Sequence, residues 1–320
     1  MERLLIIGAN GQIGSELVTA LAEQHGAANV IASDIGTSNV YGAARYTQLD
    51  VLDRERLASL IDLEGITQVY QLAALLSATG EQAPLKAWTL NMDGLLNILE
   101  VARERGEAGK PLKVFWPSWI AAFGPNTPAE NTAQYTVMDP TTIYGISKLA
   151  GERLCEYYHT KYGVDVRSIR YPGIISYKSP PGGGTTDYAI AIFHAALRGE
   201  TYECFLGPES TLPMIYMPDA IRATIELMEA PLDQVAIRSS YNVAGVSFNP
   251  SELAAAIQKA RPGFAIAYAP DSRQQIADSW PKSLDDSRAT ADWGWQSRIG
   301  IDEMVDSMLA NIDVGIKAAA

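Results

Sequence analysis

The stretch Leu4–Gly14 reads LLIIGANGQIG and decides the fold of this 320-residue chain. Its first four residues are apolar and predict a short buried strand, which ends at Gly8. From Ile13 to Ala22 the apolar residues recur at helical spacing. A strand, a glycine-rich turn and a helix in this order predict the first unit of a parallel α/β sheet.

The same alternation of strand and helix continues through the first half of the chain. Further strands are predicted over residues 30–32, 46–49, 68–72, 113–116 and 166–169, and helices over 54–61, 91–105 and 144–161. Repeated β-α-β units place parallel strands in one sheet with helices on both faces. The predicted fold class is therefore α/β, a doubly wound Rossmann-type parallel sheet with a smaller C-terminal substrate lobe.

The first turn has the spacing Gly-x-x-Gly-x-x-Gly at Gly8, Gly11 and Gly14, a variant of the dinucleotide fingerprint. One glycine permits the tight turn, one lets the backbone approach a pyrophosphate, and one lets helix and sheet pack closely. The N-terminus of the following helix also offers free N–H groups to an anion. An ordinary glycine turn is the alternative for the glycines taken alone.

Two acidic positions follow this turn. Asp34 lies 20 residues after Gly14, at the end of the predicted second strand, where its carboxylate can accept hydrogen bonds from both ribose hydroxyls of an adenosine. The same charge would repel a 2′-phosphate, so NAD is favoured over NADP. Asp50 with Val51 either places a carboxylate near the adenine amino group or caps a helix, and the sequence leaves both open.

The segment Ser179–Thr186, SPPGGGTT, is rich in residues that break helices and strands, and it interrupts the regular alternation of strands and helices. We expect an NAD-binding Rossmann domain over residues 1–173, to which the chain returns around 215–247. A substrate-binding lobe is expected over 174–214 and 248–320. Beyond this segment, helices are predicted over 187–198, 219–229, 251–259 and 301–312, with Asp219 and Ser251 as N-caps.

Composition excludes several classes of protein. The formal charge of -12, from 25 Lys plus Arg against 37 Asp plus Glu, repels nucleic acid and anionic lipid. The apolar runs are far shorter than the ~20 residues that cross a bilayer. Only two cysteines and three histidines are present, which favours a reducing, cytoplasmic location and no metal site.

Tyr144 and Lys148 are four residues apart, so on a helix a phenol and an ammonium project from one face about one turn apart. A nearby cation stabilises a phenolate, which allows the phenol to act as a base toward an alcohol. An isolated pair of this kind is usually part of a solvated helix face. Its place downstream of a dinucleotide fingerprint favours the catalytic interpretation.

The glycine turn, Asp34, Tyr144 and Lys148 together resemble the extended short-chain dehydrogenase/reductase family. Further segments resemble its L-threonine 3-dehydrogenases of the sugar-nucleotide-epimerase-like type more narrowly. These segments run through nearly the whole chain: Leu72–Glu81, Tyr144–Glu152, Arg167–Gly173, Pro180–Tyr188 and Ala277–Pro281.

The resemblance implies NAD-dependent oxidation of the L-threonine 3-hydroxyl to 2-amino-3-oxobutanoate. Tyr144 would take the hydroxyl proton, and Lys148 would bind the nicotinamide ribose and keep the phenol acidic. Contacts to NAD are implied for Gly8, Gly11, Gln12, Ile13, Gly14, Asp34, Asp50, Val51, Leu72, Ala73, Ala74, Asn91, Tyr144, Lys148, Tyr171 and Pro172. Contacts to threonine are implied for Ser77, Trp119, Tyr144, Gly184, Thr185, Thr186 and Trp280. A homodimer through helices 91–105 and 144–161 is implied as well.

One position departs from the family. Trp119 stands where the family usually has a Ser or Thr, whose hydroxyl hydrogen-bonds the reacting oxygen. Indole donates a hydrogen bond but cannot accept one, and it is much larger than either residue. Either Ser118 turns inward and takes the catalytic role, or the pocket is altered and turnover impaired. A buried Trp119 with no role is the third possibility.

Two other functions remain open. A sugar-nucleotide epimerase or dehydratase shares the Tyr/Lys pair but needs cations for a diphosphate, and Lys178, Arg198 and Arg222 are scattered. The second alternative is a dinucleotide-binding protein with impaired turnover, and Trp119 is the only residue that supports it. A zinc-dependent threonine dehydrogenase needs Cys and His ligands that the chain does not provide.

Overall fold

The computed structural model describes residues 2–37 and 45–313, which form two compact units. The first unit comprises residues 1–122, 142–170 and 224–241, and the second comprises 123–141, 171–223 and 242–320. The segment 123–141 belongs to the second unit, which the sequence patterns did not separate. That the first unit binds NAD and the second binds substrate stays a prediction here.

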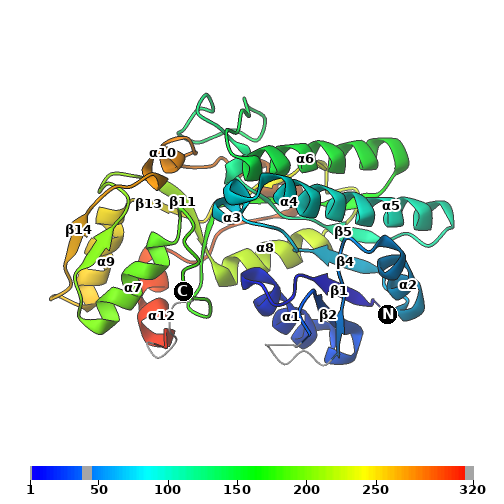
Figure 1. Ribbon diagram of the computed structural model, residues 1–320, viewed down its shortest axis with the longest axis horizontal. Coiled ribbons are helices and arrows are strands. Elements are labelled where there is room, and N and C mark those ends of the chain that lie inside the picture. Colours follow the sequence, from blue (N-terminus) through cyan, green and yellow to red (C-terminus); the bar gives the residue numbers. More distant parts are fainter. Residues whose placement is uncertain (1, 38–44, 314–320) are drawn as a thin grey trace. The chain divides into compact units, whose positions relative to one another are not determined.

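The first unit is built on a six-stranded parallel sheet (Figure 1). Its strands, in spatial order, are β3 (Arg45–Gln48), β2 (Val30–Asp34), β1 (Leu4–Ile7), β4 (Gln68–Gln71), β5 (Lys113–Phe115) and β7 (Asp165–Arg167). The order reverses at β1, so the loops after β1 and β4 flank the switch point, where open α/β sheets bind ligands. The predicted fold class is confirmed.

Helices cover both faces of this sheet. Leu5 and Ile7 of β1 pack in one core with α2 (Arg54–Glu64), α5 (Gly94–Glu107) and α6 (Ile143–Tyr162). Leu4 and Ile6 point to the opposite face, because side chains alternate along a strand, and Figure 1 shows α1 (Gln12–His25) on that side. All four residues of β1 are buried, as the apolar run predicted.

Local chemistry sets the ends of the helix that bears the predicted catalytic pair. The Thr142 hydroxyl accepts a hydrogen bond from the Gly145 N–H at 3.1 Å and caps the start of α6. Gly163 ends the helix in the left-handed conformation, with φ of 71°. The helix predicted over 91–105 is not a single α-helix in the structure. Its first residues belong to a π-helical turn, η2 (Thr89–Asp93), and α5 follows that turn.

Shorter elements complete the first unit. Single turns are η1 (Ala27–Asn29), α3 (Ser77–Gln82), α4 (Pro84–Trp88) and η3 (Ile120–Ala122). A small sheet has the strand order β12 (Tyr241–Asn242), β8 (Ile169–Tyr171) and β6 (Ser118–Trp119). Helix α8 (Met217–Glu229) begins among the residues of the second unit and ends among those of the first.

The second unit contains two further small sheets. In one, β11 (Leu212–Tyr216) pairs parallel with β9 (Gly173–Ile175) and antiparallel with β13 (Val246–Phe248); in the other, β10 (Tyr202–Cys204) pairs with β14 (Ile266–Tyr268). Its helices are α7 (Tyr188–Arg198), α9 (Pro250–Ala260), α10 (Arg273–Asp278), α11 (Ser287–Trp293) and α12 (Ile301–Asn311). No helix among the described residues is long and apolar enough to cross a membrane.

Two predicted helix caps are wrong. Helix α9 is capped by Asn249, whose side chain accepts from the Glu252 N–H at 2.9 Å, rather than by Ser251. Pro250 can occupy the first helical position because it needs no N–H partner there, so the helix starts earlier than expected. Asp219 lies inside the first turn of α8, and its carboxylate accepts from the backbone N–H of Arg298 at 2.8 Å.

Candidate active site

The turn after β1 requires its glycines. Gly8 has φ of +82°, and a Cβ there would lie 2.7 Å from the Ala73 nitrogen. A Cβ on Gly14 would lie 2.3 Å from the Gly8 oxygen, so α1 packs onto the turn only without a side chain. Gly11 is the N-cap of α1 and provides no side-chain hydrogen bond, and Gln12 and Ile13 form the first turn. Their N–H groups suit an anion such as a pyrophosphate.

This close packing leads to a first prediction. Gly14→Ala should weaken NADH binding by at least about tenfold, because the new methyl group forces α1 away from the turn that the pyrophosphate would contact. Gly106→Ala in α5 is the matched control, because a Cβ there meets nothing within 4 Å. A fluorescence titration with NADH measures both variants. Equal affinities for the two variants would contradict a role of this turn in cofactor binding.

Asp34 ends β2 beside the glycine turn. Its carboxylate accepts hydrogen bonds from the N–H of Asn10 at 3.1 Å and of Gly36 at 3.4 Å. Carboxylate oxygens have about four lone-pair sites, so acceptors are left for ribose hydroxyls. The geometry suits the predicted contact with the adenosine ribose.

Asp50 does not cap the following helix. That cap is Asp53, whose side chain accepts from the Arg56 N–H at 3.0 Å, so the alternative interpretation of Asp50 is wrong. The Asp50 carboxylate instead accepts from the Leu52 N–H at 2.9 Å within its own turn. The adjacent Val51 is buried. A contact of Asp50 and Val51 with adenine stays a prediction.

The side chain of buried Asn91 fixes the loop after β4. The Asn91 carbonyl oxygen accepts from the Leu75 N–H at 2.8 Å, and its amide donates to the Leu75 oxygen at 3.1 Å and to the Ser147 hydroxyl at 3.3 Å. Asn91 therefore ties the π-helical turn to both the loop and α6. The preceding residues Leu72, Ala73 and Ala74 are half-buried and follow β4 directly. Their predicted contacts with NAD are untested.

Tyr144 and Lys148 lie buried on one face of α6, 5% and 3% exposed. The Lys148 ammonium donates to the Pro117 carbonyl oxygen at 2.6 Å. Its nitrogen lies 4.6 Å from the ring centroid of Trp116 and 5.4 Å from that of Tyr144. Both distances are within the ~6 Å range of cation–π attraction. The structure thus places the predicted pair together in an enclosed setting.

Burial dominates the acid–base properties of this pair. It lowers the pKa of Lys148 from 10.5 to about 7, while the nearby Cys155 and Glu152 act in the opposite direction. Burial also raises the pKa of the Tyr144 phenol well above its usual value of 10. A phenolate at this position therefore needs positive charge beyond that of Lys148.

The lowered pKa of Lys148 predicts a pH-dependent stability. Between pH 7 and 10.5 the unfolded chain binds the lysine proton and the folded chain does not, so the unfolding free energy rises with pH across this window. We expect the wild type to gain roughly 3 kcal/mol relative to Lys148→Met between pH 7 and pH 10. Urea unfolding at several pH values measures the difference. Parallel pH curves for the two proteins would contradict the lowered pKa.

Ser118 and Trp119 form the short strand β6. The Ser118 hydroxyl is fully buried and donates to the Glu152 carboxylate at 2.6 Å. Its hydrogen is thus directed to Glu152, and a catalytic role would require this bond to break. Trp119 is half-buried in the same strand. The roles predicted for both residues stay predictions.

The predicted substrate residues fall in both units. Ser77 begins α3 of the first unit, half-buried. In the second unit, Thr185 is buried, and a Cβ on Gly173 would lie 2.7 Å from the Thr186 methyl group, so Thr186 packs against that glycine. Trp280 follows α10 and is 6% exposed. Tyr171 and Pro172, predicted to contact NAD, are buried in the second unit.

Three polar residues that sequence reasoning left unassigned have structural roles here. The Asp187 carboxylate accepts from the N–H groups of Gly182 at 2.6 Å and Gly184 at 2.8 Å, which fixes the glycine loop. Burial raises the pKa of Asp187, and these bonds oppose the rise. The other two, Glu152 and Arg170, form a buried ion pair. An acid at the first residue of the helix predicted over 187–198 was the available signal for Asp187.

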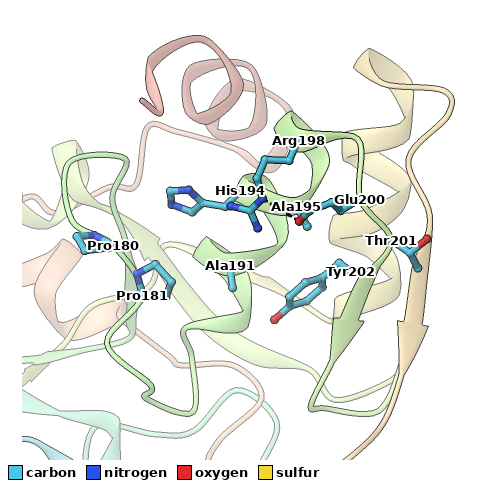
Figure 2. Close-up of a pocket in the computed structure, with 9 residues that line it drawn as sticks. All are labelled: Pro180, Pro181, Ala191, His194, Ala195, Arg198, Glu200, Thr201 and Tyr202. Atoms are coloured by element: carbon cyan, nitrogen blue, oxygen red, sulfur yellow. Dashed lines mark hydrogen bonds and ion pairs between the residues drawn. The ribbon is translucent and has the colours of Figure 1, made fainter. Parts of the chain in front are cut away.

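The second unit also contains a cavity of about 300 Å³ (Figure 2). Pro180 and Pro181 line one side. Residues of α7, of the connection after it and of β10 line the rest, including His194 and Tyr202. The Tyr202 hydroxyl is buried with no hydrogen-bond partner among the described residues. The cavity borders the start of the glycine loop, but its lining contains none of the predicted substrate residues. Among the described residues, no group of three or more His, Cys, Asp or Glu side chains could hold a metal.

The strand order, the glycine turn and the Tyr144–Lys148 helix define a class of dinucleotide-dependent α/β enzymes. Residues 4–244 match the NAD dependent epimerase/dehydratase family. The chain belongs to this family, which confirms the predicted enzyme class and the predicted cofactor, NAD.

Several relatives narrow the comparison further. The chain is 60% identical to the structure of a GalE-like L-threonine dehydrogenase from Cupriavidus necator in its holo form, with a TM-score of 0.94 over 97% of this chain and 100% of that one. It is 44% identical to a mitochondrial L-threonine 3-dehydrogenase of Bos taurus, over 96% of this chain and 82% of the relative. It is 45% identical to an uncharacterized epimerase/dehydratase of Staphylococcus haemolyticus, over 98% of both chains.

Proposed function

We propose that this chain is an NAD-dependent L-threonine 3-dehydrogenase. It oxidises the 3-hydroxyl of L-threonine to 2-amino-3-oxobutanoate, and NAD is reduced. The main support is the buried Tyr144–Lys148 pair on α6 in a chain 60% identical over nearly its whole length to an L-threonine dehydrogenase. The products balance, since the hydride goes to NAD and the hydroxyl proton goes to Tyr144 and then to solvent.

Residues of the first unit would bind the cofactor and move the proton. Gly8, Gly11 and Gly14 bind the pyrophosphate, and Asp34 accepts from the adenosine ribose. NAD supplies a hydride acceptor and a positive charge on its oxidised ring. That charge favours the Tyr144 phenolate, which burial alone disfavours. Lys148 donates hydrogen bonds to the nicotinamide ribose.

Residues of the glycine loop would bind the amino acid. Thr185 and Thr186 offer neutral hydroxyl groups to a zwitterion. Ser77, Trp119 and Trp280 stay predicted contacts of the amino acid. Asp187 supports this role, since it fixes the loop through Gly184. A loop of this kind can exclude water from the path of the hydride.

We propose a homodimer through the helices predicted over 91–105 and 144–161, together with α4, which lies directly before the first of them in the chain. Large apolar side chains on these elements are exposed: Leu85 by 85%, Trp88 by 39%, Ile146 by 42% and Tyr157 by 45%. Light scattering after gel filtration should give about twice the chain mass of 34.6 kDa. Ile146→Asp should shift this mass toward the monomer, because it buries a charge in the interface, while Leu232→Asp, also exposed, should not. A monomeric wild type at micromolar concentration would overturn the proposal.

We also propose a cytoplasmic location. Both cysteines, Cys155 and Cys204, are free and buried, which agrees with a reducing compartment.

A sugar-nucleotide epimerase is the alternative with the same chemistry. Two of the three cations available for a diphosphate are already paired: Arg198 binds Glu200 at 2.8 Å, and Arg222 binds Asp219 at 2.8 Å. This argues against an arginine clamp for phosphate groups.

The test mixes purified chain with NAD and either L-threonine or UDP-glucose. The proposed function predicts NADH absorbance that rises with L-threonine. Turnover of UDP-glucose without net NADH would support the epimerase. Binding of NADH without turnover of either substrate would support a dinucleotide-binding protein whose turnover is impaired by Trp119.

A further inference from the structure

A buried chain of hydrogen bonds connects Lys148 back to its own helix. The ammonium donates to the Pro117 oxygen at 2.6 Å, and the next residue, Ser118, donates its hydroxyl to Glu152 at 2.6 Å. Glu152 lies one helical turn after Lys148, so the two side chains share a face of α6. These contacts close a ring that consists of one turn of α6 and the segment Pro117–Ser118.

Arg170 of β8 locks the carboxylate of Glu152 in this ring. Its Nε donates to one carboxylate oxygen at 2.9 Å and its Nη2 to the other at 2.7 Å. Glu152 is fully buried and Arg170 is 1% exposed. A bidentate pair of this kind restricts both the position and the rotation of the carboxylate.

The charges in this region explain why the carboxylate matters to Lys148. The groups that face Glu152 are Ser118 from β6, Arg170 from β8, and Lys148 and Cys155 from α6. Burial raises the pKa of the Cys155 thiol, so the thiol stays neutral near pH 7. Glu152 is thus the negative charge that opposes the effect of burial on Lys148.

We propose that Glu152 is a positioning residue for the active site. Its carboxylate fixes Pro117–Ser118 against α6, so that the Pro117 oxygen stays at the Lys148 ammonium, and its negative charge partly offsets the cost of burying that ammonium. The kinetic part of this inference rests on the proposed dehydrogenase function. The effect of the Glu152 charge on Lys148 does not depend on that function, because it concerns only the protonation of Lys148.

Two substitutions separate charge from geometry. Glu152→Gln keeps the size and removes the charge, and Glu152→Asp keeps the charge and shortens the side chain. Because Glu152→Gln removes the buried carboxylate that pairs with the Arg170 charge and can prevent folding, the double variant Glu152→Gln/Arg170→Met removes both members of the pair. Ser118→Ala removes one bond and leaves every charge in place.

The first readout needs no activity. The pH dependence of unfolding, measured with and without Lys148→Met in each background, reports the pKa of Lys148. We expect the double variant to lower this midpoint, and Glu152→Asp and Ser118→Ala to leave it near the wild-type value. A midpoint unchanged in the double variant would overturn the charge role.

The second readout is the pH profile of kcat/KM for L-threonine. We expect its Lys148-dependent limb to move to lower pH in the double variant only. In Glu152→Asp and Ser118→Ala, kcat should fall about tenfold. In both variants the Lys148-dependent limb of the pH profile and the affinity for NADH should stay as in the wild type. Wild-type kcat in both would overturn the positioning role. A wild type without threonine oxidation would refute the proposed function, while the unfolding curves would still decide the charge role.

Discussion

Tyr144→Phe should lower kcat for threonine oxidation by about 10³-fold, within the ~10²–10⁴-fold range that a positioned proton-transfer group contributes. Tyr144 is 5% exposed, and phenylalanine fills the same space without the hydroxyl. Hydride transfer from C3 leaves a protonated carbonyl unless a base takes the hydroxyl proton. Removing that base therefore slows the chemical step, while the affinity for NADH stays near the wild-type value.

Tyr158→Phe is the matched control on the same helix. Tyr158 is also buried, and its hydroxyl donates to Glu100 at 2.6 Å, so the variant loses about 1 kcal/mol of stability and keeps its turnover. Steady-state rates and an NADH titration on both variants make the comparison. Similar turnover in Tyr144→Phe and the wild type would remove the phenol from the mechanism.

Trp119→Ser should raise kcat with L-threonine by about 10²-fold, the smallest loss that usually follows removal of one donor to the reacting oxygen. The family that the chain resembles usually has a hydroxyl at this position. Indole cannot accept a hydrogen bond and relay a proton. The side chain is also larger, so the exchange enlarges the pocket as well as restoring the donor.

Two further variants separate these effects. Trp119→Ala reduces the side chain without adding a hydroxyl, and Trp119→Phe removes the indole N–H while keeping a smaller aromatic ring. The difference in kcat between the Ser and Ala variants measures the hydroxyl. If Trp119→Ser showed no gain in kcat, the explanation by a missing hydroxyl would be wrong, and the buried-tryptophan interpretation would be preferred.

The glycine turn and the Tyr144–Lys148 pair follow closely from the sequence. The glycine spacing is informative because a Cβ at Gly8 or Gly14 would collide with backbone atoms, so no other residue type fits. Tyr144 and Lys148 were predictable for a similar reason, since helical spacing alone places them on one face.

Long-range partners were beyond sequence reasoning. Glu152 of α6 pairs with Arg170 of β8, 18 residues further along the chain, and nothing in the spacing selects that partner. The same limit applies to Ser118, because the sequence does not reveal that its hydroxyl donates to Glu152. The catalytic role of Ser118, one of the possibilities left open, stays a prediction. The π-helical turn at Asn91 was missed because the apolar periodicity continues through it.

The most direct test of the proposed function follows one hydrogen atom. The protein is incubated with NAD and L-threonine deuterated at C3, and the reduced cofactor is analysed by mass spectrometry. Hydride transfer from C3 predicts reduced cofactor one mass unit heavier than NADH, formed at a rate that Tyr144→Phe lowers by about 10³-fold. Reduced cofactor without deuterium, or no reduced cofactor at all, would contradict the proposed reaction.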